Sequence, residues 1–246
     1  MINDRRLNKK LGRKIFLPTL LNGAQKMSLD TLGRQALWRE LDGHQGWNAD
    51  VLARVFHVLR EATDGVVGAR DIALIDPVLL DQLLDSSSTI LGASNNNQSQ
   101  NLKTVGDTMK ATRCALFILH YGEVVMGVAA YIREWKHWVV CSANQALEDG
   151  MKARFCFIAS QLNRLNLVPL YNHGIQFFCP GQSNTGTKVN GIYTTFYCYV
   201  LLRSIKHFDI RDDFATHLAM ELVVLGENNR DEFVRHLRAI VDPFSL

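Results

Sequence analysis

The chain has 246 residues, of which 47% are hydrophobic and 21% are charged. This composition suits a globular domain and excludes a mostly disordered chain, because there is ample apolar surface to bury. No stretch approaches the roughly 18 uncharged apolar residues of a membrane span, so we expect no membrane association. Glycine (17) and proline (5) are too sparse for a collagen-like or proline-rich protein.

The five cysteines are odd in number and scattered, and they form no C-x-x-C pair. A zinc ribbon or a dithiol redox motif is therefore not expected, and we predict no metal and no other cofactor. Most of the cysteines lie in apolar runs, which favours buried thiols in a reducing compartment, nuclear or cytoplasmic. The cysteines are Cys114, Cys141, Cys156, Cys179 and Cys198.

The basic charge is concentrated at the N-terminus. Residues 1–26 carry seven basic side chains against Asp4 alone, in a chain whose net charge is +3, so the remainder is net negative. We expect residues 1–35 to form a basic arm and residues 36–246 a single domain. The run RRLNKKLGRK resembles a nuclear localisation signal; a solvated arm and a mitochondrial presequence are the alternatives. Nucleic-acid contact is expected of this arm at most, not of the body.

Helical spacing appears first in the N-terminal half. Residues 37–41 and 49–62 have apolar side chains at helical intervals, and Asp50 suits the start of the second helix. Asp76-Pro77 predicts the beginning of another short helix. The polar stretch that follows, SSSTILGASNNNQSQ, predicts a flexible surface loop within residues 86–104.

The period then changes to that of strands. Cys114–Tyr121, Val124–Ile132 and Lys136–Ala143 are short apolar runs separated by tight polar breaks, which predicts a three-stranded antiparallel unit buried on much of both faces. Residues 174–179 predict one more strand. Helices are expected over residues 150–165, 191–205, 211–225 and 230–241.

This order of elements predicts an α+β fold in which helices flank a central antiparallel sheet. No phosphate-binding G-x-x-x-x-G-K-[ST], no G-x-G-x-x-G after a strand and no H-E-x-x-H is present.

Several local patterns resemble the ubiquitin-like-protein proteases, cysteine proteases with a papain-like fold that remove SUMO or NEDD8. W-N-A-D at 47–50 is similar to the family's W-L-N-D, CPGQ at 179–182 to its oxyanion segment, and N-G-I-Y at 190–193 to its C-G-[IV]-[YF]. The hairpin over 124–143 resembles the central strands, and residues 209–222 resemble the closing helix. The similarity extends from about residue 40 to 225.

The resemblance implies a His general base, an Asp that orients it, a Cys nucleophile at a helix N-terminus and a Gln in the oxyanion hole. Carried onto this chain, these positions hold Glu123, Cys141, Asn190 and Gln182. Only the glutamine is retained, and the loop from it to Asn190 is longer than the family pattern. The resemblance therefore predicts no peptidase turnover through this site, with binding expected of Trp47, Asp50, Trp138, Gln182 and Asn184.

Two displaced catalytic sites are alternatives. His137, before Trp138, reproduces the family's H-W dipeptide one strand late and could act with Asp149 and Cys198, although Cys198 lies two turns into its helix. His120 could reach the base position if the loop that follows it is rearranged.

Three functions follow from these observations. The first is a catalytically inactive protease homologue that binds SUMO, NEDD8 or ubiquitin. The second is a scaffold or complex subunit that binds another protein and no modifier. The third is an active cysteine peptidase or acyltransferase with a displaced triad.

Overall fold

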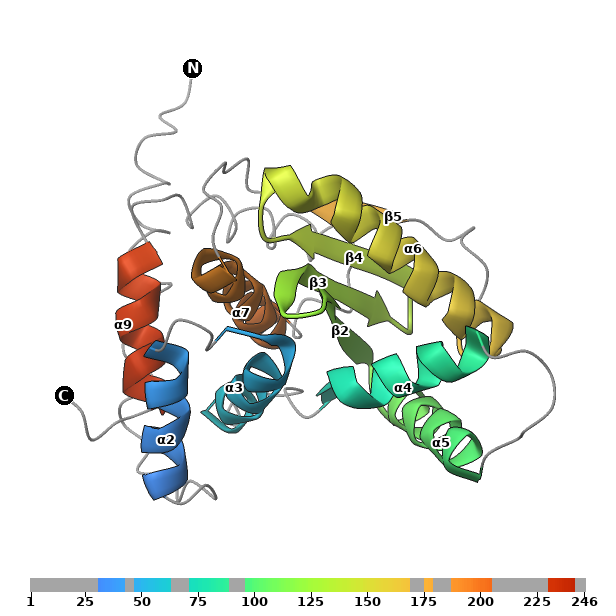
Figure 1. Cartoon of the computed structure of the whole chain (residues 1–246), viewed down its shortest axis with the longest axis horizontal. Helices are drawn as coiled ribbons and strands as arrows, with labels where there is room; N and C mark the ends of the chain where they lie inside the picture. Colours follow the sequence, from blue (N-terminus) through green and yellow to red (C-terminus); the bar gives the residue numbers. More distant parts are fainter. Residues whose placement is uncertain are drawn as a thin grey trace, which may run out of the picture.

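The computed structural model describes residues 31–42, 47–62, 71–88, 96–168, 175–178, 187–204 and 230–241. Within these ranges a five-stranded sheet has the order β1-β2-β3-β4-β5 and is packed between helices on both faces (Figure 1). The strands are β1 (Ile72–Leu74), β2 (Cys114–Tyr121), β3 (Val124–Ile132), β4 (His137–Ser142) and β5 (Ile175–Phe178).

The centre of the sheet is the antiparallel meander β2-β3-β4, which confirms the sequence prediction. Its side chains are buried on both faces because helices cover each side. The outer strands are parallel to their neighbours: β1 pairs with β2, and β5 pairs with β4. Strand β1, which has only three residues, was missed by the sequence analysis.

On one face of the sheet, α7 (Thr187–Ser204) packs against β3 and β4, and α3 (Ala49–Ala62), α9 (Arg230–Val241) and α2 (Thr31–Asp42) complete the same core. The other face packs against α4 (Pro77–Ser88), α5 (Asn96–Ala111) and α6 (Glu148–Arg164), which follows the short 3-10 helix η2 (Gln145–Leu147). The helices and strands together confirm the α+β class.

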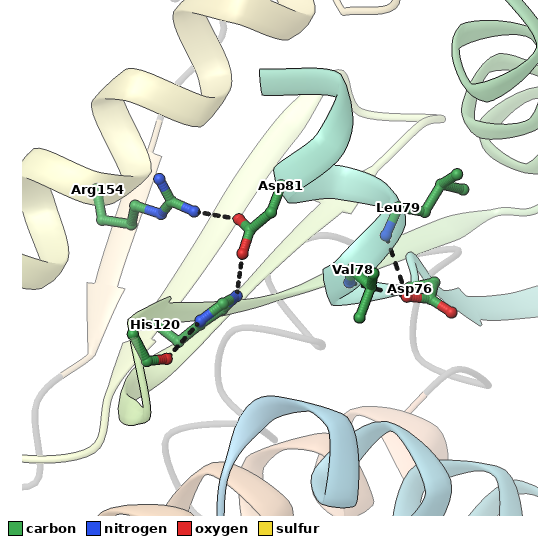
Figure 2. A network of polar contacts seen from close by, with 7 residues as sticks. Asp76, Val78, Leu79, Asp81, His120 and Arg154 are labelled. Atoms are coloured by element: carbon green, nitrogen blue, oxygen red, sulfur yellow. Dashed lines mark hydrogen bonds and ion pairs between the residues drawn. The ribbon is translucent and has the colours of Figure 1, made fainter. Parts of the chain in front are cut away.

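Polar side chains set two helix starts. The Asn48 Oδ1 atom accepts a 3.0 Å hydrogen bond from the Val51 amide, and Asp50 lies in the first turn of α3. The Asp76 Oδ1 atom accepts bonds of 2.8 and 3.2 Å from the amides of Val78 and Leu79 (Figure 2). Both starts agree with the prediction from sequence.

Two expected boundaries are wrong. Helix α2 begins at Thr31, so the last five positions of the expected 1–35 arm are helical. The expected loop over 86–104 is helical at both ends, since α4 extends to Ser88 and α5 begins at Asn96. The predicted helix over 211–225 lies outside the described residues. Among the helices of the described ranges, none combines the length and apolar character needed to cross a bilayer.

Candidate functional site

The segment that opens α3 packs directly on the first turns of α7. Trp47 is 1% exposed, and a Cβ atom added at Gly191 would lie 2.4 Å from the Trp47 Cβ. Glycine at 191 therefore lets the indole approach the helix backbone. The fold thus brings together the W-N-A-D and N-G-I-Y motifs, which are far apart in the sequence.

Asn190 lies at the end of the first turn of α7, three positions after the helix begins. Its side chain is 4% exposed, and among the described residues its Oδ1 atom has no hydrogen-bond partner. No acidic residue lies in this first turn. A carboxamide at this position has no ionisable group and cannot become the nucleophile that a thiolate provides.

Glu123 lies in the two-residue turn between β2 and β3 and is exposed. Gly122 precedes it with φ +55°, as the first central position of a type II′ hairpin turn requires. The turn holds the carboxylate at the rim of the sheet, in water.

Cys141 lies on β4, where its register partners are Val128 on β3 and Phe178 on β5. It is fully buried in the core under α7. Burial raises the pKa of the Cys141 thiol far above its usual range, and the neighbouring Cys198 adds to this shift. A thiol in this state is a small core side chain that cannot orient a base.

Across the described ranges, no hydrogen bond or ion pair joins Glu123, Cys141 and Asn190 to one another. Gln182, expected in the oxyanion hole, and Asn184 lie outside the described residues. The assignment of Glu123, Cys141 and Asn190 to the catalytic positions therefore stays a prediction from the sequence alignment. In the part of the chain that the structure describes, these three side chains do not bond to one another.

His120 lies in a polar network on the opposite face of the sheet from α7 (Figure 2). Its Nε2 atom is 3.4 Å from Asp81 Oδ2 on α4, and its Nδ1 atom is 3.1 Å from the carbonyl oxygen of Gly122. Asp81 also pairs with Arg154 on α6, at 2.5 Å. These contacts fasten the β2–β3 turn to two helices, so His120 is engaged away from α7.

The alternative His137–Asp149–Cys198 site is not assembled. His137 is buried at the start of β4, and Asp149 is exposed in the first turn of α6, on the other face of the sheet from Cys198. Burial raises the pKa of the Cys198 thiol to about 12, so it stays protonated at neutral pH.

The two tryptophans expected to bind are core side chains. Trp138 packs on the rings of Phe117, Tyr131 and Phe155 at centroid distances of 5.4, 5.0 and 5.2 Å. Trp47 packs on α7, as described above. Of the residues expected to bind, Asp50 alone is exposed within the described ranges.

Sequence reasoning missed the Asp81–His120–Arg154 network. The register between β2 and β3 shifts between Leu119 and His120, because Met126 of β3 is an extra residue at this β-bulge, and His120 lies against Asp81 of α4. In the sequence, Gly122 shortly after His120 indicates a turn. It does not indicate which helices contact the histidine.

Comparison with known proteins shows the fold. No protein-family model matches the chain, and no curated protein matches its sequence. A solved structure described as the de-sumoylating protease is similar at a TM-score of 0.55 and 9% identity, over 85% of this chain and 83% of that one. A Xanthomonas XopD mutant is similar at a TM-score of 0.50 and 12% identity, over 71% of this chain and 96% of that one. The chain therefore has a ubiquitin-like-protease, cysteine-protease fold.

Proposed function

We propose that this chain is a pseudoprotease, a protein with a SUMO-protease fold that binds a ubiquitin-like modifier without cleaving it. The observation that carries the proposal is Asn190, a buried carboxamide in the first turn of α7, where the motif of the resembled family has its nucleophilic cysteine. Deprotonation of this side chain cannot provide a nucleophile, so no acyl-enzyme forms there.

The thiols of the described residues support the proposal. Cys114, Cys141 and Cys198 are buried, and burial raises the pKa of each. Cys156 is exposed, but it lies on α6, on the far side of the sheet from α7. The three buried thiols therefore lack the exposure of a catalytic cysteine, and the exposed one lies away from Asn190.

The choice of partner is supported by the fold and by what a similar protein acts on. One solved structure with this fold is a de-sumoylating protease, and we infer a SUMO-like modifier as the first candidate here. Modifier recognition uses a large protein surface, whereas cleavage uses a few side chains, so binding can outlast the loss of turnover. We further propose an intracellular location, nuclear or cytoplasmic, as the cysteine pattern favours.

The experiment combines covalent capture with binding. The chain is incubated with SUMO, NEDD8 and ubiquitin that carry a C-terminal electrophile, and binding of the unmodified modifiers is measured by calorimetry. Binding without an adduct supports a pseudoprotease, whereas an adduct at one cysteine would make the protein an enzyme. If neither binding nor an adduct is found, the proposal is contradicted and the alternative of a scaffold for another protein is favoured.

A designed thiol sharpens this test. Asn190→Cys places a thiol near the helix N-terminus, where the helix dipole favours thiolate. We expect the electrophilic modifier to label the Asn190→Cys variant by proximity, even without a base. The matched control is Thr194→Cys, one turn further along α7 and also buried. Equal labelling of both variants would show nonspecific reaction rather than a bound modifier.

A further inference from the structure

A row of hydrogen-bonded polar side chains joins the C-terminal half of α7 to α9. The Nη1 atom of Arg203 donates a 3.1 Å hydrogen bond to the Tyr199 hydroxyl. The same hydroxyl lies 3.1 Å from Nε2 of His236, on α9. The Tyr199 and His236 rings also meet at a steep angle of 64°, with centroids 5.6 Å apart.

The direction of bonding along this row of side chains depends on the protonation of His236. A guanidinium can only donate, so the Tyr199 oxygen accepts from Arg203, and a neutral His236 ring can accept the Tyr199 proton. His236 Nε2 then accepts, and the neutral ring has its proton on Nδ1. If His236 is protonated, both ring nitrogens become donors, so the ring can no longer accept from Tyr199, and the cations of Arg203 and His236 then meet at one phenol oxygen.

The surrounding charges favour the neutral ring. Partial burial lowers the pKa of His236 below the ordinary 6.5, and the nearby Arg203 cation on α7 lowers it further. Glu232, one turn earlier on α9, opposes these two effects. The ion pair of Arg34 on α2 with Glu61 on α3 meets α9 one turn after His236, where Arg34 bonds to the Ile240 carbonyl.

We propose that His236 is a pH-sensitive latch, which holds α9 on α7 while its ring is neutral and loosens α9 when the ring is protonated. The sign follows from linkage. Above the ordinary histidine pKa of 6.5, the folded and unfolded chains both carry neutral His236, and the latch contributes fully. As the pH falls from there toward the lowered pKa of the folded state, the unfolded or detached helix gains a proton first, and the contribution is lost.

Loosening α9 would affect the helix that carries Asn190. Phe233 of α9 packs edge-on against Phe196 of α7, with ring centroids 5.0 Å apart, and Leu237 is buried in the same core. Detachment exposes this apolar contact and frees the C-terminal half of α7. The proposal is independent of whether the protein binds a modifier.

Hydrogen exchange of the full chain tests the latch. Protection of residues 230–241 is measured at pH 7.5 and 5.5, corrected for intrinsic exchange and compared with α5, which contains no histidine. We expect protection of α9 to fall severalfold at the lower pH in the natural chain. In His236→Gln, whose side-chain oxygen can accept from Tyr199 but does not titrate, protection should be independent of pH. Unchanged protection in the natural chain, or the same loss in His236→Gln, would overturn the proposal.

Two further measurements guard against misfolded variants. His57 on α3 also has a pKa lowered by burial, so His57→Gln should leave the pH dependence of α9 intact. Nitrogen NMR of the natural chain at pH 7.5 should find the His236 proton on Nδ1. A proton on Nε2 would contradict the latch without any mutation.

Discussion

The Arg34 guanidinium donates a 3.1 Å hydrogen bond to the backbone carbonyl of Ile240, and so joins the first and last described helices. Arg34 is 2% exposed and also pairs with Glu61 of α3 at 3.3 Å. A buried cation in this position is costly unless both contacts are made, and its burial lowers the pKa of Arg34. The side chain therefore fixes how α2, α3 and α9 meet.

Replacing the Arg34 side chain should destabilise the fold. We expect Arg34→Ala to lower the free energy of unfolding by about 2–4 kcal/mol, because a buried carbonyl loses its donor and a cavity forms. Urea denaturation gives the measurement. The control is Arg54→Ala, whose partner Glu40 is reached at 2.6 Å but whose side chain is 53% exposed. Loss of that exposed pair should cost less than about 1 kcal/mol. Equal losses would contradict the structural role assigned to Arg34.

The close contact between Trp47 and Gly191 predicts that alanine is tolerated less well at Gly191 than at Gly150. A methyl group at 191 would lie 2.4 Å from the Trp47 Cβ, so Gly191→Ala must displace the indole and should destabilise the fold by about 1–3 kcal/mol. At Gly150, in α6, an added Cβ would meet only the Met126 sulfur at 3.5 Å, an ordinary contact. Gly150→Ala should be neutral or stabilising by up to about 1 kcal/mol, because alanine favours helix. Thermal unfolding separates the two, and a neutral Gly191→Ala would refute the packing.

The thiols predict a pattern of chemical labelling. Iodoacetamide at pH 8 should modify the exposed Cys156 quickly and leave Cys114, Cys141 and Cys198 unmodified until the protein unfolds. The pKa of Cys198, about 12, keeps this thiol protonated across the usual labelling range, so raising the pH to 9 should not speed its reaction. Peptide mass spectrometry locates the modified sites. Rapid modification of Cys198 in the folded chain would instead support the alternative of an active enzyme with a displaced triad.

The network around His120 predicts a local effect. Asp81→Asn removes the carboxylate shared by His120 and Arg154, and should loosen the β2–β3 turn while lowering stability by only about 1 kcal/mol, because Asp81 is 37% exposed. Hydrogen exchange of residues 120–124 should accelerate, whereas exchange in α3 should not. Uniform acceleration across both segments would indicate a global effect instead.

Much of the fold was predictable from periodicity. The central meander and α3 follow from apolar runs and helical spacing whose burial the structure confirms. Helix α5 was missed because its Asn- and Ser-rich start has the composition of a loop, although Leu102, Val105 and Met109 recur at helical spacing and pack on the second core. Strand β1 is too short to have a pattern of its own, and it depends on pairing with β2.

The site was predictable only in part. The sequence assigned W-N-A-D and N-G-I-Y to motifs of one family, and the structure brings the two motifs together. That Trp47 and Trp138 are enclosed in the two cores depends on how the helices pack, which no local pattern reveals. The partners of His120 depend on a register shift between β2 and β3, which no local pattern of the sequence predicts.

The strand order also has a consequence for how the chain acquires its structure. Strands β2, β3 and β4 follow one another through tight connections, so their pairing closes only short loops and costs little chain entropy. Strands β1 and β5 pair with the edges of this meander. In the sequence, α4 and α5 separate β1 from β2, and α6 separates β4 from β5. The meander can therefore form early as a nucleus, while the two margins of the sheet are added later and exchange their amide hydrogens first.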